Sequence, residues 1–359
     1  MAEFTDKHNA FRKEIREFAK SELLEESTQI DRKGEFPWHI INKIKERGWL
    51  GVPFPREYGG LGLDTTSYIL LIEEIARVCA STAIMIAAHV SLACQPIYAN
   101  GTEEQKKKYL VPLARGEKIG SFGLTEPNAG SDAGGTETTA TLVADTWIIN
   151  GTKRFITDGH VADVIVFTAS QDRSKKVHGI SAFIVEKGTK GYEPGKEEEK
   201  MGLRGSITSE LHFEDCELPR ENLLGKEYGG FKVFMETLDG GRISIGVLAL
   251  GIAQGALDYS VVYAQQNILK GKPLHKYQWV QKIIADAATE IAAARHLIYH
   301  GAMLKDRGEK SITKEGAMAK LYASEISTRV CAKLQSIFGE DGITRKFPLE
   351  RFLIDTKLM

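Results

Sequence analysis

The sequence has almost no net charge and lacks several common catalytic motifs. Its 47 Lys and Arg residues nearly balance its 48 Asp and Glu residues, so no global field favours nucleic acid or an anionic membrane as a partner. It contains no Walker A sequence, no HExxH, no GxSxG and no strand-led GxGxxG. These absences argue against phosphoryl transfer, zinc proteolysis and Rossmann-type nicotinamide binding, and they favour a small molecule as the partner.

Cysteine is also scarce, and its spacing excludes the common metal and redox motifs. The four cysteines show no CxxC or metal-site spacing and are expected to be packing residues in a reducing compartment: Cys79, Cys94, Cys216 and Cys331. His296 and His300 form an i,i+4 pair, but no carboxylate or cysteine stands at a suitable offset. We therefore expect no metal site.

Signals for export and membrane insertion are missing as well. The first residues mix acids with bases and lack an apolar segment, so we expect no signal peptide. No run approaches the roughly 18 apolar residues that a membrane span would need. We predict cytoplasmic localisation, or the mitochondrial matrix for a processed eukaryotic protein.

Hydrophobic periodicity divides the chain into three parts and predicts a multi-domain α+β protein. Residues 1–118 show helical spacing and predict a helical N-terminal domain. Residues 119–226 contain short alternating or apolar runs, such as VADVIVFTA and ELHFEDCEL, and predict a β domain. Residues 227–359 return to helical spacing and predict a C-terminal helical bundle.

Several local patterns refine this division. Within the first part, residues 51–62 predict a loop, residues 68–98 predict a buried helix or helix pair, and Thr102 with Gln105 predicts a capping box. The charged insert 191–206 is expected to contain a mobile loop. Three glycines in the last part are expected to leave a shallow stripe where another helix can approach closely: Gly246, Gly251 and Gly255.

The stretch from Ser121 to Gly159 is the strongest candidate for ligand binding. Its first part, 122–131, combines hydroxyls, a carboxylate, a proline turn and glycine, and therefore predicts a binding loop. Strands are predicted at 138–142, 146–149 and 152–157, with a hairpin turn at Asn150-Gly151. A ligand loop is thus expected to be mounted on β structure.

Four ordered motifs in the chain resemble those of the FAD-dependent acyl-CoA dehydrogenase family: LTEPNAGSDAG, NGTKRFITDG, MGLRGS and LDGGR. The resemblance extends to TEEQKKKYLVPLARGE and KFPLERFLIDTKL, and its general look is that of short-chain or branched-chain members. It implies an all-α N-terminal domain, a middle β-barrel and a C-terminal four-helix bundle. FAD would lie between the last two domains and reach into a neighbouring subunit.

The resemblance also implies roles for particular residues. The cofactor-binding set is Phe122, Leu124, Thr125, Gly130, Ser131, Phe155, Ile156, Thr157 and Gln278, and the set facing acyl-CoA is Ser131, Asp239 and Arg242. Phe155 stands where tryptophan is usual and keeps a flat apolar wall beside the flavin. On the alternative interpretation, Thr157 is an ordinary strand residue and Arg242 a helix-end ion pair.

The reaction that the resemblance implies is a step of fatty acid β-oxidation. A carboxylate would abstract the α-proton of an acyl-CoA thioester, a hydride would pass to the flavin, and the product would be the 2-enoyl-CoA. Such a weak C–H acid demands a base in a dry pocket whose pKa is raised by desolvation. An electron-transfer flavoprotein would then accept the electrons.

The sequence departs from the family at the catalytic base. The usual glutamate loop would follow residues 353–359, and the less common position for this glutamate is occupied by Gly241. Glu340, Glu350 and Asp355 resemble ordinary surface or helix-end residues, so the catalytic residue stays unassigned.

Further departures concern the neighbour's FAD. Asn267 replaces an arginine expected on its pyrophosphate, and Glu340 and Asp341 bring carboxylates towards it. Two hypotheses follow: a working homo-oligomeric dehydrogenase that is longer than this sequence or takes its base from elsewhere, or a non-catalytic or half-site subunit of a hetero-oligomer with a paralogue.

Overall fold

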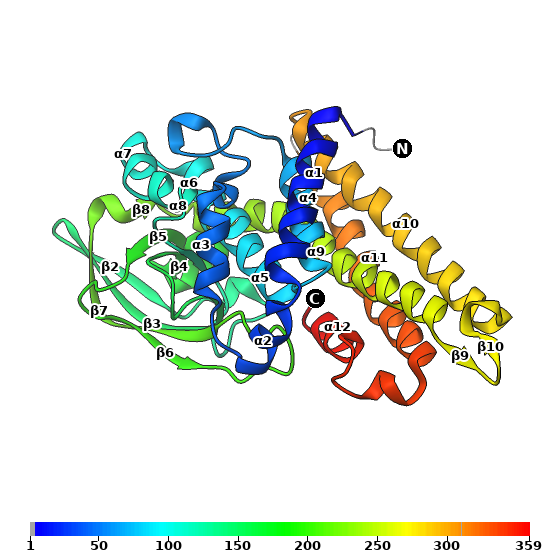
Figure 1. The fold of residues 1–359 in the computed structure, drawn as a ribbon. Coiled ribbons are helices and arrows are strands. Elements are labelled where there is room, and N and C mark those ends of the chain that lie inside the picture. Colours follow the sequence, from blue (N-terminus) through cyan, green and yellow to red (C-terminus); the bar gives the residue numbers. More distant parts are fainter. Residues whose placement is uncertain (1–3, 310) are drawn as a thin grey trace.

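Helices from both ends of the chain pack together beside a sheet formed by its middle (Figure 1). The computed structural model describes residues 4–309 and 311–359. The N-terminal helices are α1 (Asp6–Phe18), α2 (Glu26–Lys33), α3 (Trp38–Glu46), α4 (Thr65–Ala76), α5 (Ala80–Ala87), α6 (Gln95–Asn100), α7 (Glu103–Gln105) and α8 (Val111–Ala114). The π-helical turn η4 (Ala88–Cys94) joins α5 to α6.

Local sequence signals in this part are confirmed. The Thr102 side chain accepts a hydrogen bond from the Gln105 backbone, and the Gln105 side chain accepts one from the Thr102 backbone, which completes the predicted capping box. Residues 68–98 form the expected helix pair, with a break between α4 and α5. Gly51 ends the 3-10 helix Trp49–Gly51, and residues 52–62 are turns and irregular chain around a second short 3-10 helix, Arg56–Tyr58.

The middle of the chain forms one mixed sheet of eight strands in the order β6-β7-β3-β2-β4-β5-β8, with β1 parallel to β4. The strands are β1 (Gly120–Gly123), β2 (Thr139–Val143), β3 (Thr146–Thr157), β4 (Val164–Ser170), β5 (Ile180–Glu186), β6 (Tyr192–Glu197), β7 (Thr208–Pro219) and β8 (Leu223–Leu224). Strands β4 and β5 are almost entirely buried. Their apolar runs therefore fill the core of the sheet domain.

The predicted hairpin turn at Asn150-Gly151 is wrong. Strand β3 runs through this dipeptide without a break, and the two-residue turn of the hairpin lies earlier, at Ala144 and Asp145. The Asn150 side chain instead exchanges hydrogen bonds of 2.8 and 3.0 Å with Asp215, the extra residue of a bulge in β7. A Cβ on Gly151 would lie 2.5 Å from Thr138 Oγ1, so this glycine serves a close strand contact.

The mobile loop expected within the insert 191–206, ahead of Met201, is wrong for residues 192–197. Residues 192–197 form the edge strand β6, which pairs antiparallel with β7. Tyr192 is buried and its ring centroid lies 5.3 Å from that of Phe213. Although the residues that follow are charged, the burial of Tyr192 against β7 favours a paired strand here.

Long helices complete the fold. They are α9 (Gly230–Gln266), α10 (Gln278–Asp306), α11 (Thr313–Gln335) and the short α12 (Leu349–Asp355), with a small hairpin of β9 (Ile268–Leu269) and β10 (Lys272–Pro273) between α9 and α10. The predicted glycine stripe on α9 is confirmed where it meets α4. A Cβ on Gly251 would lie 2.6 Å from Glu73 O, and a Cβ on Gly255 would lie 2.3 Å from Arg77 O.

Two helical stretches in the described part are long and apolar enough to cross a membrane by length and composition alone: Ala80–Asn100 and Gly230–Gln266. The sequence-based statement that no run approaches a span is therefore too strong. Their most apolar windows are 83 % and 61 % buried inside the protein, as in the core helices of a soluble domain.

A buried ion network ties α1, α4 and α10 together. Glu73 on α4 is 1 % exposed and accepts hydrogen bonds from Arg295 (2.7 Å) and Tyr299 (2.6 Å), while Arg12 lies 3.4 Å away. Burial alone would raise the pKa of Glu73, but the two guanidinium groups outweigh it and lower this pKa. The predicted domain boundary at 118/119 lies between α8 and β1, and the one at 226/227 lies between β8 and α9. Both boundaries stay predictions.

Substituting Gly251 tests the close contact between α4 and α9. We expect Gly251→Ala to destabilise the fold by about 1–3 kcal/mol, because the added methyl would meet the α4 backbone. Gly246→Ala is the matched control, since its Cβ would lie 3.4 Å from the nearest atom and alanine favours helix. Urea denaturation measures both, and equal stability of the two variants would contradict the contact.

Candidate active site

The ligand loop that follows β1 is held directly against the end of β3. Ser121 Oγ donates a 2.6 Å hydrogen bond to Thr157 O, and the Arg154 backbone donates a 2.7 Å hydrogen bond to Thr125 O. The structure therefore brings two predicted flavin-facing segments together, 122–125 and 155–157. The hydroxyls of Thr125 and Thr157 have no hydrogen-bond partner within residues 4–309 and 311–359.

Helix α9 reaches the same place through an aromatic contact. The Phe122 ring stacks on the buried ring of Phe234, with centroids 4.1 Å apart and an interplanar angle of 23°. His89 anchors β1 from the other side, because its Nδ1 accepts a 3.0 Å hydrogen bond from the Gly120 backbone and its Nε2 lies 3.0 Å from Leu113 O. Burial lowers the pKa of His89 to about 4, so this ring is neutral.

Phe155 presents an uncovered aromatic ring beside the loop. Its side chain is 55 % exposed, and its backbone has a φ of 57°, next to the irregular register between β3 and β7. The Arg154 guanidinium lies 4.7 Å from the ring centroid. Ile156 is buried on the opposite face of the strand, so the local irregularity turns Phe155 outward and keeps Ile156 in the core.

The remaining predicted residues are more scattered. Gly130 and Ser131 lie exposed at the tip of the loop, and a Cβ on Gly130 would meet no atom within 4 Å. Leu124 is half-buried within the loop. Gln278 begins α10 beside the β9–β10 hairpin, at the opposite end of the molecule from the sheet (Figure 1). The structure thus does not bring Gln278 to the loop of its own chain.

Asp239 and Arg242 form an ion pair with each other on α9. Asp239 also accepts a 2.5 Å hydrogen bond from Thr313 Oγ1 at the start of α11. In the absence of a ligand, Arg242 therefore makes the ion pair that was the alternative to substrate binding. Its side chain keeps 37 % of its surface exposed, which leaves donors of the guanidinium accessible.

The acids near the C-terminal end make other contacts. Glu350 pairs with Arg345 at 3.3 Å, and buried Asp355 accepts a 2.7 Å hydrogen bond from the Leu203 backbone. Glu340 is exposed. Gly241 is buried, and a Cβ there would lie 3.0 Å from Leu92 Cδ2. These contacts agree with leaving the catalytic base unassigned.

Asp355 and a second buried carboxylate, Asp158, bond to the same loop, and sequence analysis did not single out Asp158. Both bond to the loop of residues 201–206, which we call the junction loop. Ser206 Oγ lies 3.4 Å from Asp158 Oδ1, and the other oxygen of Asp158 has no partner in the described part of the chain. Burial raises the pKa of Asp158 to about 7 and that of Asp355 to about 7.

The junction loop also contacts the N-terminal helices. Arg204 Nε donates to Asp31 O of α2 at 2.9 Å, and the Gly205 backbone donates to Ser81 Oγ of α5 at 3.2 Å. All three parts of the chain therefore bond to this one loop. Sequence reasoning matched it as a family motif, but only the fold shows that it joins three parts.

A pocket of about 270 Å³ borders the ligand loop. It is lined by Asp132, Gly134, Gly135, Thr136, Ser170, Arg173, Lys176 and Val177. Arg173 and Lys176 supply positive charge, and the buried Ser170 hydroxyl has no partner among the described residues. This composition suits an anionic ligand group.

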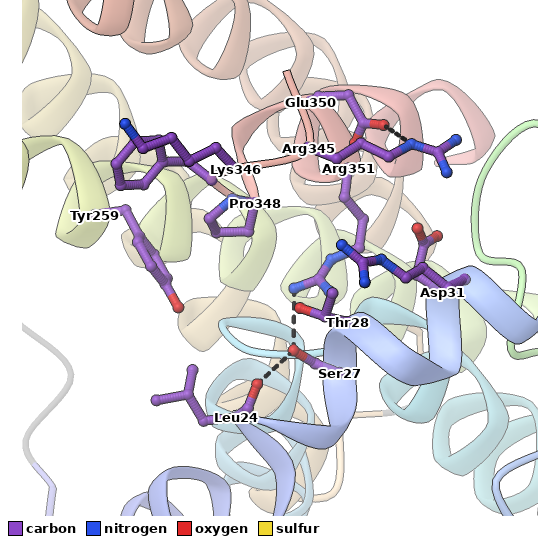
Figure 2. Close-up of a pocket in the computed structure, with 12 residues that line it drawn as sticks. Leu24, Ser27, Thr28, Asp31, Tyr259, Arg345, Lys346, Pro348, Glu350 and Arg351 are labelled. Atoms are coloured by element: carbon purple, nitrogen blue, oxygen red, sulfur yellow. Dashed lines mark hydrogen bonds and ion pairs between the residues drawn. The ribbon is translucent and has the colours of Figure 1, made fainter. Parts of the chain in front are cut away.

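A second pocket, of about 300 Å³, lies between α2 and the segment leading into α12 (Figure 2). Figure 2 shows Arg351 pointing down to Ser27, which it meets at 3.2 Å, while Glu350 turns away towards Arg345. None of the predicted site residues lines this pocket. We therefore treat it as a junction between helices rather than part of the site.

The side chains that commonly bind metals are dispersed. All four cysteines are buried and unpaired with one another. Across residues 4–309 and 311–359, no group of three or more His, Cys, Asp or Glu side chains is arranged to hold a metal ion. His296 and His300 instead line an open, largely apolar hollow between α10 and α11.

Comparison with known proteins identifies the class to which this fold and site belong. Family models for the acyl-CoA dehydrogenase N-terminal, middle and C-terminal domains match residues 5–117, 121–216 and 228–359. The chain therefore belongs to the acyl-CoA dehydrogenase family. The predicted family and fold class are confirmed, and the chain is an oxidoreductase whose cofactor is FAD.

Individual relatives are similar over nearly the whole chain. The short-chain specific acyl-CoA dehydrogenase of Clostridium acetobutylicum is 46 % identical over 354 residues, 99 % of this chain and 93 % of the relative. Butyryl-CoA dehydrogenase from Megasphaera elsdenii is 45 % identical with a TM-score of 0.97, covering 99 % and 94 % of the two chains. A chain in a structure of the electron transferring flavoprotein of Acidaminococcus fermentans is 48 % identical, with a TM-score of 0.98 and coverage of 99 % and 93 %.

The residues of the loop fit FAD. An isoalloxazine ring needs a flat apolar wall and polar partners at its edge, and the chain offers the exposed Phe155 ring together with the free hydroxyls of Thr125 and Thr157. The open space around Gly130 leaves room for a ligand at the loop tip. When bound, FAD supplies the hydride acceptor of the reaction.

The buried Asp158 makes stability depend on pH. Because its pKa is raised from 3.8 to about 7, the folded protein binds this proton more tightly, and stability falls as pH rises between these values. We expect Asp158→Asn to add on the order of 2 kcal/mol near pH 8, with a smaller gain at lower pH. Thermal denaturation across pH measures this. Asp145→Asn, at a side chain 89 % exposed, is the control, and a pH-independent gain would contradict the assignment.

Proposed function

We propose that the protein catalyses the flavin-dependent α,β-dehydrogenation of a short-chain acyl-CoA to the 2-enoyl-CoA. The observation that carries this proposal is the joining of 122–125 to 155–157 into one surface with an uncovered ring and free hydroxyls. The short-chain preference draws support from the 46 % identity to a short-chain specific relative.

The residues of this chain have distinct roles in that reaction. Phe155 would offer an apolar wall to the flavin, Ile156 anchors its strand in the core, and the hydroxyls of Thr125 and Thr157 would supply polar contacts to it. Phe122 and Leu124 exclude water from the loop side. Gly130 leaves the loop tip open for the cofactor, and Arg242 and Asp239 meet the acyl-CoA from α9.

The CoA end of the substrate is proposed to approach the pocket beside Ser131. CoA is strongly anionic, and Arg173 and Lys176 offer positive charge to a phosphate. The carboxylate of Asp132 also lines the pocket, and Arg173 lies 3.5 Å from Glu137 Oε1, so part of this charge is compensated within the chain. The pocket begins at Asp132, next to Ser131 in the chain, which connects it to the predicted CoA-facing residue.

The half-site alternative is not favoured by the comparisons. Two departures that motivated it also have local explanations in the fold. The Asn267 side chain bonds to Tyr263 O at 2.9 Å at the end of α9, and Asp341 pairs with Lys346 at 3.2 Å. The asparagine thus closes a helix end, and one of the two acidic groups is compensated within the chain.

An oligomer and an electron-transfer flavoprotein are the proposed partners. A hollow between α10 and α11 is lined by His296, His300 and Tyr322. Helix α11 also exposes two apolar side chains, Leu321 at 63 % and Met318 at 46 %. Gln278 lies far from the loop of its own chain and could serve the site of a second copy. The Acidaminococcus fermentans structure motivates the electron acceptor. Cytoplasmic or matrix localisation stays a proposal.

Absorbance spectroscopy tests the function directly. We expect the purified protein to show bound flavin, and anaerobic butyryl-CoA to bleach it because the substrate reduces the cofactor, while free CoA should not. Light scattering on the same sample should give more than one subunit. Flavin bound without bleaching by short-chain acyl-CoA would contradict the proposed reaction, and flavin retained only with a co-expressed paralogue would support the half-site alternative.

The basic pocket has its own test. We expect Arg173→Ala with Lys176→Ala to raise KM for acyl-CoA roughly tenfold, with little change in kcat or flavin content, because two contacts to phosphate are lost. The effect should shrink at high salt. Arg220→Ala, at an exposed residue paired with Asp145, is the control. An unchanged KM would remove this pocket from the substrate site.

A further inference from the structure

One ion pair lies buried behind the ligand loop, and neither of its two residues belongs to the predicted ligand-binding set. Lys153 of β3 and Glu126 of the loop have side chains that are 0 % and 1 % exposed, and Lys153 Nζ lies 2.6 Å from Glu126 Oε1. Burying two charges is costly unless their remaining hydrogen bonds are satisfied. The surroundings of this pair satisfy them.

The ammonium of Lys153 has three hydrogen-bond acceptors. Besides Glu126, it donates to Thr168 Oγ1 of β4 at 3.1 Å and to Leu124 O of the loop at 3.3 Å. A lysine ammonium has three donors, so all are used inside the protein. Lys153 therefore joins the beginning of the loop to two strands of the sheet.

The carboxylate of Glu126 closes the loop on itself. One of its oxygens accepts a 2.6 Å hydrogen bond from the Glu137 backbone, and both lie 3.2 Å from the Thr138 backbone nitrogen. The two ends of segment 126–138 are thus tied to one carboxylate, which in turn is tied to β3. Gly130 and Ser131 lie between these ends, exposed and without close packing at Gly130.

We propose that Lys153 and Glu126 are positioning residues that fix the loop in register with Phe155 and Thr157, so that one surface is preformed for the cofactor. The expected effect on FAD binding rests on the proposed function. The expected effect on the order of the loop does not depend on it. Burial lowers the pKa of Lys153 to about 8, so the ammonium stays charged near neutral pH.

A double substitution separates positioning from stability. Each single variant, Glu126→Gln or Lys153→Met, leaves the charged group of the other residue buried without its partner. Each is therefore expected to lower the melting temperature. The double variant removes both charges with similar volumes and should recover most of it. If the pair positions the loop, the double variant will still bind FAD at least roughly tenfold more weakly, because the charge-assisted tie to β3 is gone.

Hydrogen exchange of segment 126–138 provides a readout that needs neither substrate nor turnover. We expect amides of this segment, including Glu137 and Thr138, to exchange faster in the double variant. The control pair Lys190→Met with Glu217→Gln removes an exposed Lys–Glu pair of the same domain, with a Nζ–Oε1 distance of 2.7 Å and exposures of 81 % and 48 %. It should change neither FAD affinity nor exchange.

Wild-type FAD affinity and wild-type exchange of the loop in a stably folded double variant would overturn the inference. This outcome is separate from failure of the proposed function, which would appear as a wild-type protein whose flavin no short-chain acyl-CoA bleaches. Faster exchange together with weaker FAD binding supports the positioning role whatever the substrate proves to be.

Discussion

The close approach of α9 to α4 depends on glycines, and the same helix carries Phe234, which stacks on Phe122 of the ligand loop, and the Asp239–Arg242 pair. At Gly251 and Gly255 a side chain would collide with the α4 backbone. The buried carboxylate of Glu73 stands at this contact and binds groups from α10. A change in the distance between α4 and α9 would therefore move the helix that carries Phe234 and Arg242.

Motifs whose partners are close in sequence were predictable, while those that depend on distant strands were not. The Thr102–Gln105 capping box is complete within four residues, and the glycine stripe of α9 is a property of one helix. Asn150-Gly151 has the local signature of a turn, yet its conformation is decided by pairing with β7, more than sixty residues away. The edge strand β6 was missed for the same reason, since Tyr192 gains its burial from β7.

The candidate site divides in the same way. Family resemblance selected Phe155, Thr157 and the loop from local motifs, and the fold places these segments together. What holds them was hidden in the sequence, because nothing local distinguishes the buried Lys153 and Glu126 from the many exposed lysines and glutamates. The near-neutral pKa values of Asp158 and Asp355 likewise arise from burial in the assembled fold. Gln278 is the opposite case. Family resemblance selected it as a cofactor-binding residue, but the fold places it far from the ligand loop of the same chain.

The junction loop also has a consequence for how the molecule comes apart. Its few residues bond to α2, α5, α12 and the end of β3, so no part of the chain can separate without breaking contacts made by the other parts. The protein should therefore unfold as one cooperative unit rather than as three foldons with separate transitions. A fragment containing only the sheet would carry this loop without its partners on α2, α5 and α12.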